Sequence, residues 1–305
     1  MIPEKLDVID AHTHFFSYTW LEHFFNLARD KFPAEAGVEA LAKFLGWEMP
    51  PRDPRELAKQ WIAEQNKYGL KAQVLFASKL NDAEFLAAAI QNYPERLIGY
   101  AMINPLAPEA RDLTRYCLTI LNMKGILMFP AMHHFYANDE KIYPVLEEAA
   151  VAFAPVFIHF GFLKIPIYQK LGLDDNIDLQ YSLPSYLLET AKEFPEVNFI
   201  IPHFGCGYFE EALEVARQCK NVYFDTSSSN SWIQLPLTLK EVFRICLQEL
   251  GARRLLFGTD SSYFPRGWRQ DIFQQQWQIL DELKVPLAER KLIFADNLNR
   301  LLNLK

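Results

Sequence analysis

The sequence predicts a (β/α)8 TIM barrel, an α/β fold in which eight parallel strands alternate with helices. Two observations predict it: eight short, almost continuously apolar segments recur along the 305 residues, and segments with helical patterning separate them. A third observation argues against a doubly wound open sheet. Such a sheet usually carries a glycine-rich first turn, whereas here that turn reads His12-Thr13-His14-Phe15-Phe16.

The expected strands are rich in Ile, Val, Leu and Phe, which is typical of parallel strands covered on both faces. In chain order they are Leu6–Ala11, Ala72–Ala77, Leu97–Ile103, Gly125–Phe129, Val156–His159, Asn198–Ile201, Val222–Phe224 and Leu255–Gly258. Parallel strands need crossover connections, which are usually helices, so helices are expected between these strands.

Helix start signals occur in these connecting segments. Asp53, Pro54 and Glu56 together predict an N-cap, a proline at the first helical position and a capping-box acid. Asn81 opens another helix, which stops ahead of Pro94. The expected helices are Pro54–Lys67, Asp82–Asn92, Pro108–Leu121, Ile142–Ala152, Pro184–Phe194, Phe209–Gln218, Leu239–Leu250, Arg269–Leu283 and Pro286–Leu302.

Two longer segments interrupt the alternation. Residues 15–52 lie between the first strand and its helix and are rich in aromatic residues, and residues 161–183 follow the fifth strand. No low-complexity linker and no internal repeat beyond the βα unit is visible. We therefore expect one domain over residues 1–305, with insertions at about 15–52 and 161–183.

Composition excludes several classes of protein. The net charge of −7 argues against a generic nucleic-acid or anionic-membrane binder, because both partners attract an excess of Lys and Arg. No signal pattern and no membrane-length apolar run occurs, which predicts a cytoplasmic protein. The four cysteines lack a CxxC pair, so neither a disulfide framework nor a Cys-type zinc site is expected. The expected partner is a small-molecule substrate, and a homodimer is left open.

Six of the seven histidines lie at the end of a predicted strand or in the loop after one, where such a barrel builds its active site. They are His12, His14, His133, His134, His159 and His203; His23 lies in the first insertion and has no expected role.

Four of the strand-end residues form a candidate metal site. His12 and His14 are two residues apart and project to the same side of their strand. Closure of the barrel brings Asp260 beside them, and His159 faces them across the mouth. Three imidazoles and a carboxylate suit one Zn²⁺ and, less selectively, Mn²⁺, Fe²⁺, Co²⁺ or Ni²⁺. Each histidine alone is more often a hydrogen-bonded structural residue, so the prediction depends on the joint occurrence.

The chain resembles the amidohydrolase superfamily, specifically the amidohydrolase-related metal-dependent hydrolases that include aminocarboxymuconate semialdehyde decarboxylase-like enzymes. The matching motifs lie in the family's order: Val8-Ile9-Asp10-Ala11-His12-Thr13-His14, Pro155-Val156-Phe157-Ile158-His159, Phe199-Ile200-Ile201-Pro202-His203-Phe204-Gly205, Leu255-Leu256-Phe257-Gly258-Thr259-Asp260 and Ala295-Asp296-Asn297-Leu298-Asn299-Arg300-Leu301-Leu302.

The resemblance implies that His12, His14, His159 and Asp260 hold one divalent metal, with His203 just beyond it as an acid/base or electrostatic catalyst. Members of the superfamily that bind two metal ions resemble one another in having a carboxylated lysine on strand four that bridges the two ions. Here Lys124 precedes that strand, at the wrong end, which predicts a mononuclear site.

Such a site favours two reactions. The first is hydrolysis of a small cyclic or aromatic amide, lactone or ester by a metal-activated water, with Asp260 or His203 carrying the proton. The alternative is non-oxidative decarboxylation of a small unsaturated or aromatic acid, in which protonated His203 delivers H⁺ to carbon. A third alternative, an inactive binding barrel, is opposed by the intact ligand set.

Several residues are candidates for contacting the substrate. Phe16 and Tyr263 belong to an aromatic group at the mouth that favours a planar substrate. His133 and His134 are candidates to orient the metal ligands or to contact substrate, with a position in a solvated loop as the equally favoured alternative. Arg52 is the candidate cation for an acidic substrate, with Lys43, Arg266 and Arg269 as alternatives, although for each of these a solvated surface charge is the commoner role.

Overall fold

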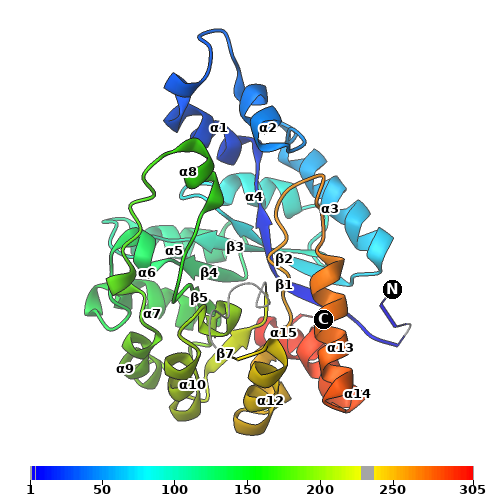
Figure 1. Cartoon of the computed structure of the whole chain (residues 1–305). Helices are drawn as coiled ribbons and strands as arrows, with labels where there is room; N and C mark the ends of the chain where they lie inside the picture. The colour runs from blue at the N-terminus through cyan, green and yellow to red at the C-terminus, as the bar shows by residue number, and fades with distance from the viewer. Residues whose placement is uncertain (1, 4, 228–236, 305) are drawn as a thin grey trace.

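The computed structural model describes residues 2–3, 5–227 and 237–304 and contains one sheet of eight parallel strands in the order β1 to β8 (Figure 1). This confirms the predicted TIM barrel. The strands are β1 (Ile9–Phe15), β2 (Ala72–Ala77), β3 (Leu97–Met102), β4 (Gly125–Met128), β5 (Val156–Ile158), β6 (Phe199–Ile201), β7 (Val222–Asp225) and β8 (Leu255–Leu256). Only β1 is clearly displaced from its prediction: it pairs with β2 as far as Phe15, so the polar residues from His12 to His14 belong to the strand.

The barrel closes between β1 and the segment after β8. The Asp260 amide donates to the His12 carbonyl at 2.9 Å, and the His14 amide donates to the Ser261 carbonyl at 2.7 Å. The buried carboxylate of Asp10 strengthens this seam by accepting from the amides of His12 and Thr259, each at 3.0 Å. The closure therefore places Asp260 beside His12, as the sequence predicted.

A register shift in β1 sets which side chains face the barrel interior. The pairing of β1 with β2 slips between Asp10 and Thr13. Before the shift, Ile9 and Ala11 pack in the inner core, whereas after it Phe15 packs in the outer core against the helices. Bulges of this kind often lie beside active sites because they re-aim side chains. Phe15 is therefore a core residue and lies outside the aromatic group at the mouth.

Helices cover the outside of the sheet (Figure 1). The helices of the βα units and the C-terminus are α3 (Pro54–Tyr68), α4 (Ala83–Ile90), α5 (Ala110–Thr119), α6 (Pro130–His133), α7 (Tyr143–Val151), α9 (Leu187–Glu193), α10 (Phe209–Gln218), α12 (Leu239–Glu249), α13 (Gln270–Glu282), α14 (Leu287–Lys291) and α15 (Asn297–Leu302). The single helix expected over Pro286–Leu302 is interrupted by a π-helical turn at Leu292–Asp296. Asp53 caps α3 through the Arg55 amide at 2.9 Å, but Glu56 pairs with Lys59 instead of completing a capping box.

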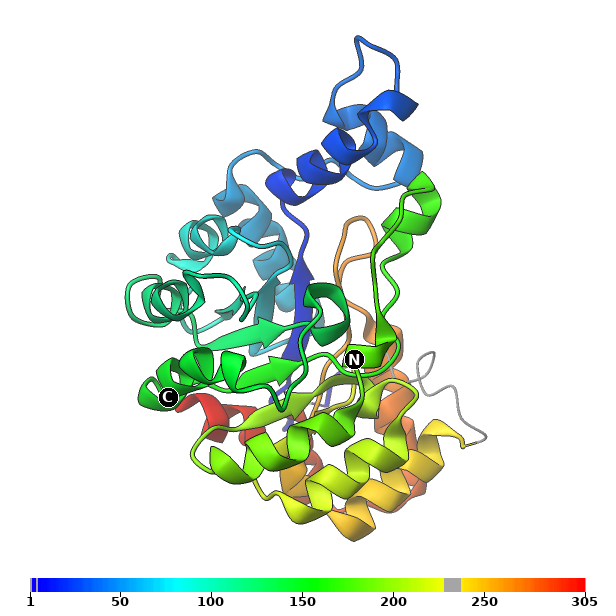
Figure 2. The same cartoon turned by 90° about the vertical axis from the view of Figure 1, so that its left-hand side faces the viewer.

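The two predicted insertions pack against each other above the barrel. The first contains α1 (Tyr18–Leu27) and α2 (Val38–Leu45), and the second contains α8 (Pro166–Leu171). Both Figure 1 and Figure 2 show α8 reaching up to α1 and α2. Ile167 and Leu171 of α8 belong to the same buried cluster as Trp20 and Phe24 of α1. The insertions thus form one small core of their own over the C-terminal ends of the strands.

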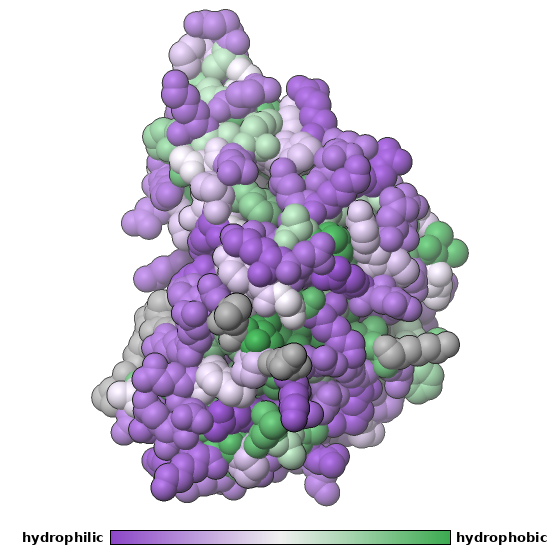
Figure 3. Space-filling view, turned by 90° about the vertical axis from the view of Figure 1, so that its right-hand side faces the viewer, coloured by the Kyte–Doolittle hydropathy of each residue, from purple (hydrophilic) through white to green (hydrophobic). Residues whose placement is uncertain are grey.

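On the face seen in Figure 3, hydrophilic residues predominate and the apolar patches are small and separate. None of the helices within the described residues combines the length and the apolar character needed to cross a bilayer.

Candidate metal centre

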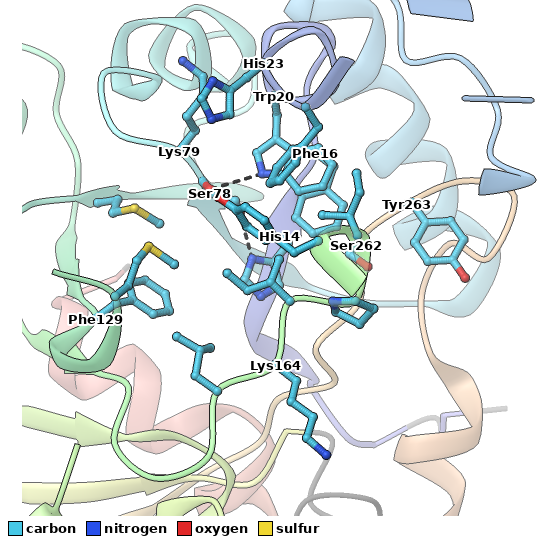
Figure 4. Close-up of a pocket in the computed structure, with 18 of the residues that line it drawn as sticks. His14, Phe16, Trp20, His23, Ser78, Lys79, Phe129, Lys164, Ser262 and Tyr263 are labelled. Carbon is cyan, nitrogen blue, oxygen red and sulfur yellow. Dashed lines mark hydrogen bonds between the residues drawn. The ribbon is translucent and has the colours of Figure 1, made fainter. Parts of the chain in front are cut away.

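A cavity of about 750 Å³ opens above the C-terminal ends of the strands, beneath the insertions. Its volume falls within the usual range for a small-molecule site. His14, His159, His203 and Asp260 lie in its lining (Figure 4 shows the part around His14). The barrel supplies the floor, while α1, α2 and α8 supply much of the wall.

Three predicted ligands converge at this floor. The Nε2 atoms of His12 and His14 lie 3.4 Å apart, and Asp260 Oδ1 lies 3.2 Å from the Nε2 of His14 and 3.7 Å from that of His12. Within the described residues these three side chains form the group whose donor atoms all lie within 4.8 Å of one another. Asp260 adopts a left-handed φ of 55°, a conformation that non-glycine residues rarely take and that tends to occur at functional sites.

Asp225 orients His12 through a hydrogen bond to its Nδ1 atom. Its Oδ2 accepts from His12 Nδ1 at 2.6 Å, and the carboxylate also accepts from the Ser227 amide at 2.7 Å and the Ser227 hydroxyl at 2.9 Å. Gly258 makes room for this contact, because a Cβ at Gly258 would lie 2.6 Å from the Asp225 carboxylate and 2.9 Å from the Cβ of His12. The site therefore requires glycine at this position.

Ser78 orients His14 through a hydrogen bond to its Nδ1 atom. The single hydroxyl proton of Ser78 is donated to the Phe76 carbonyl at 3.1 Å, so its oxygen accepts from His14 Nδ1 at 2.7 Å. The Ser78 carbonyl in turn accepts from the indole N–H of Trp20 at 3.2 Å, which ties α1 to this loop (Figure 4).

This donor set fits a divalent metal. Because Asp225 and Ser78 hold the Nδ1 protons, the Nε2 atoms of His12 and His14 present lone pairs toward each other and toward a carboxylate. Two lone pairs and a negative charge repel one another at such distances unless a cation lies among them. Two imidazoles and one carboxylate, each held by a hydrogen bond or by the barrel seam, are what catalytic zinc and related sites use.

Burial and the neighbouring charges shift the pKa of each side chain in this group. Burial opposes a charge on Asp260, yet the adjacent imidazoles of His14, His12 and His203 hold the pKa of the carboxyl well below its usual range. Burial also lowers the pKa of His14. Burial opposes a charge on His12, but Asp225 and Asp260 outweigh it and raise the pKa of this imidazole. An ionised Asp260 is the form that binds a metal.

His203 and His159 continue the cluster across the cavity. The His203 ring lies 5.2 Å from the rings of both His12 and His159, measured between centroids. His203 Nδ1 donates to the Ser227 carbonyl at 2.5 Å, which fixes the tautomer with a basic Nε2. Its φ of 54° lies in the left-handed region. His159 meets the three-ligand group through His203, so its assignment as a fourth ligand stays a prediction.

Aromatic rings form one wall of the cavity. The ring centroid of Phe16 lies 3.9 Å from that of Trp20 and 5.6 Å from that of Trp47. The ring centroids of Trp47 and Tyr263 are 4.3 Å apart, and the interplanar angles of all three stacked pairs are between 11° and 13°. This aromatic column, consisting of Trp20, Phe16, Trp47 and Tyr263, joins the first insertion to the loop after β8. Phe16 also lies 5.3 Å from the ring of His14, so the column begins next to the ligands.

The structure brings some of the predicted substrate contacts to the cavity and leaves others outside it. Phe16, Tyr263 and His133 line it. Burial lowers the pKa of His133 to about 4, and its Nδ1 has no hydrogen-bond partner within the described residues. His134 bonds the Asn176 carbonyl at 2.9 Å and lies outside the lining. Arg52 also lies outside it, with its guanidinium 4.6 Å from the Tyr18 ring centroid.

Sequence reasoning missed several residues of the site. Asp225 and Ser78 follow strands seven and two, so the rule that led to the histidines, a polar residue at a strand end, would have found both. His23, which had no expected role, lines the cavity beside Lys79. Its position could not be anticipated because it depends on how the insertion packs. Lys164, a further cation of the lining, comes from the second insertion.

Comparison with known proteins places this site in a family. The family model described as Amidohydrolase matches residues 9–304. Protein fluG of Emericella nidulans is 32% identical over 101 residues, which are 33% of this chain but only 12% of that protein. The matched segment therefore spans only a small part of the length of fluG.

Solved structures share the fold. A manganese-bound 5-carboxyvanillate decarboxylase, LigW2, from Novosphingobium aromaticivorans aligns with a TM-score of 0.66 at 17% identity, covering 98% of each chain. A probable 2-pyrone-4,6-dicarboxylic acid hydrolase from Acinetobacter baumannii, with citric acid bound, aligns with a TM-score of 0.62 at 15% identity, covering 98% of this chain and 100% of that one.

Proposed function

The chain belongs to the amidohydrolase family, and on that premise we propose that it is a metal-dependent hydrolase of a small cyclic or aromatic amide, lactone or ester. The observation that carries the proposal is the convergence of His12 Nε2, His14 Nε2 and the Asp260 carboxylate at the floor of the cavity. We propose one divalent ion, with Zn²⁺ as the first choice and Mn²⁺, Fe²⁺, Co²⁺ or Ni²⁺ as alternatives.

In this proposal the chain's own residues bind the ion, orient the substrate and move a proton. What a divalent ion supplies at such a site is a nucleophilic water at neutral pH and polarisation of the scissile carbonyl. Asp260 presents Oδ1 to both imidazoles, and we assign the proton transfer to its other oxygen or to His203 Nε2. The Ser227 carbonyl keeps the proton of His203 on Nδ1, so Nε2 is the basic atom.

The cavity shape favours a planar substrate. The aromatic column offers flat faces beside His14, and planar rings stack on such faces more readily than sugars or peptides do. The similar hydrolase from Acinetobacter baumannii is named for a 2-pyrone, which is a planar lactone. That name supports a cyclic ester as the first substrate class to test.

Decarboxylation is the second candidate, favoured by the basic residues in the cavity lining, which would attract an acid. This reaction needs a proton donor at carbon, whereas the tautomer of His203 presents a basic Nε2, so hydrolysis is ranked first.

A mixed panel of lactones, aryl esters, cyclic amides and hydroxybenzoate-type acids separates the two reactions. Metal-loaded enzyme is expected to release protons with at least one lactone or ester without producing CO₂. Production of CO₂ from an acid, with no hydrolysis of any panel member, would contradict the proposal and favour the carboxy-lyase.

A further inference from the structure

The side of the cavity around Phe129 is apolar. Figure 4 shows Phe129 and Tyr263 on opposite sides of His14, so this side lies away from the aromatic column. Four side chains of one apolar cluster line the cavity here: Met102, Phe129, Met132 and Leu163. A polar group set among such side chains has a strong effect on which ligands bind, because few other groups compete with it for a hydrogen bond.

His133 is the polar side chain on the short helix α6 at this side. It ends α6, and its amide donates to the Phe129 carbonyl at 3.0 Å. The side chain lines the cavity, but its Nδ1 is buried and has no hydrogen-bond partner within the described residues. The Nε2 atom is not buried in this way and bonds no side chain or carbonyl in the described part of the chain. Nε2 is therefore the atom that this imidazole offers to a ligand.

The imidazole of His133 is a neutral hydrogen-bond donor. Burial lowers the pKa of this ring to about 4, so it carries one proton near neutral pH. A proton on Nδ1 would be a buried N–H without an acceptor, and orphaned N–H groups are rarer in proteins than orphaned acceptors. The proton therefore lies on Nε2. His203 has the opposite tautomer, because the Ser227 carbonyl holds its proton on Nδ1.

Helix α6 is fixed against the second insertion. The Asp178 amide donates to the Ala131 carbonyl at 2.9 Å, and the His134 ring donates to the Asn176 carbonyl at 2.9 Å. The His134 ring also stacks on Tyr181, with the two centroids 5.3 Å apart. A donor carried by a fixed element loses little freedom when it binds a ligand, which favours a specific contact.

This donor lies across the barrel from the candidate metal site. The sheet runs in order from β1 to β8 and closes between β1 and the segment after β8, so β4 is on the far side from β8. His133 follows β4, whereas Asp260 follows β8. A substrate whose scissile carbonyl lies at the ligand group therefore directs its far end toward His133.

We propose that His133 Nε2 donates a hydrogen bond to a second carbonyl oxygen at the far end of the substrate ring. It thereby selects planar esters, lactones or amides that carry a second carbonyl group remote from the scissile bond. The inference rests on the proposed function, whose cavity and ligand group it uses. A carbonyl fits this place better than a hydroxyl, because the side chains of the apolar cluster offer no strong acceptor for the hydroxyl proton.

A binding experiment tests this without turnover. The probes are 4-acetyl- and 4-isopropenylbenzohydroxamate, together with the corresponding 3-substituted pair. A hydroxamate chelates divalent metals, and within each pair a methylene group replaces the carbonyl oxygen with little change of shape. Each probe is titrated into zinc-loaded enzyme, and calorimetry gives its Kd. In at least one pair, wild-type enzyme is expected to bind the acetyl probe about 3- to 10-fold more tightly than its partner.

Variants assign this preference to a residue. His133→Phe is expected to abolish the preference while changing the Kd of the isopropenyl probe by less than about 3-fold. His133→Gln keeps an N–H donor and is expected to retain part of the preference. His23→Phe makes the same chemical change at another histidine of the cavity lining and is expected to keep the full preference. Thermal unfolding and zinc content verify that each variant is folded and loaded, and a merely structural role of His133 would leave the ratio of the two Kd values unchanged.

The outcomes decide the proposal. It is overturned if wild-type enzyme binds none of the probes or shows no preference for the acetyl probe in either pair. It is also overturned if His133→Phe keeps the preference or His23→Phe loses it. If His133→Phe fails to fold, His133→Leu takes its place under the same criterion. Failure of the proposed function would be seen separately, as absence of proton release from the substrate panel while the probe preference persists.

Discussion

The floor and the wall of the cavity are built in different ways. The floor consists of side chains at strand ends, and a hydrogen bond aims each imidazole of the converging group: Asp225 aims His12 and Ser78 aims His14. The wall is built from the two insertions and the loop after β8, and one side of it consists of rings from the first insertion and that loop that contact one another by stacking. A hydrogen bond fixes the orientation of the imidazole that makes it, whereas two stacked rings can shift parallel to each other and remain in contact. The difference suggests that the floor determines the chemistry and the wall determines the substrate.

The largest expected effect comes from removing a floor ligand. His12→Ala should lose both the metal and the activity, because it deletes one of the converging donor atoms. Elemental analysis of the purified variant, alongside wild type, measures this. Asp260→Ala should behave in the same way, and wild-type metal content in that variant would remove Asp260 from the ligand group.

His203→Ala distinguishes a catalyst from a ligand within the floor. We expect this variant to keep its metal and to lose turnover by about 10²- to 10⁴-fold, the usual contribution of a general acid or base. Metal analysis and the proton-release assay on the same preparation check it. Loss of metal together with activity would assign His203 to the ligands instead.

The next effect concerns the residues that aim the floor ligands. Asp225→Asn should weaken metal affinity about 10- to 100-fold, because the amide can no longer stabilise the proton on His12 Nδ1 with a negative charge. Ser78→Ala should weaken it less, since the lost acceptor is neutral. Competition with a coloured chelator measures both variants. An equal loss of metal affinity in the two variants would show that the negative charge of Asp225 does not contribute to metal binding.

Gly258→Ala tests how tightly the floor is packed. The added methyl would collide with Asp225 and His12, so the free energy of unfolding should fall by about 1–3 kcal/mol and metal affinity should fall with it. Thermal unfolding with and without metal measures both quantities. Gly251→Ala is a useful comparison: Gly251, unlike Gly258, has a positive φ of 74°, but nothing lies within 4 Å of an added methyl, so only backbone strain should contribute. Metal affinity unchanged in Gly258→Ala would contradict the packing argument.

The smallest expected effects come from the wall. Trp47→Ala should leave metal content unchanged and raise KM about 10-fold, because it removes the middle of the aromatic column without touching a ligand. Steady-state kinetics on the best panel substrate measures it. A fall in metal content in this variant would remove the distinction between floor and wall.

Sequence predicted the floor far better than the wall, for a physical reason. Parallel strands bring their C-terminal ends to one rim, so His12, His14 and Asp260 could be placed together from their positions in the chain alone. The wall depends on the packing of two insertions that have no fixed geometry relative to the strands. For that reason Arg52 was expected at the cavity and lies over Tyr18, while His23 and Lys164, one from each insertion, line it unexpectedly.

Titration of a divalent ion into metal-stripped enzyme, followed by proton release from a lactone or ester substrate, tests the central claim most directly. The account predicts no hydrolysis before addition, a linear rise, and saturation at one equivalent per chain, with no response in His12→Ala. Full hydrolysis by enzyme that elemental analysis shows to be free of metal would contradict it, and saturation at two equivalents would contradict the mononuclear site.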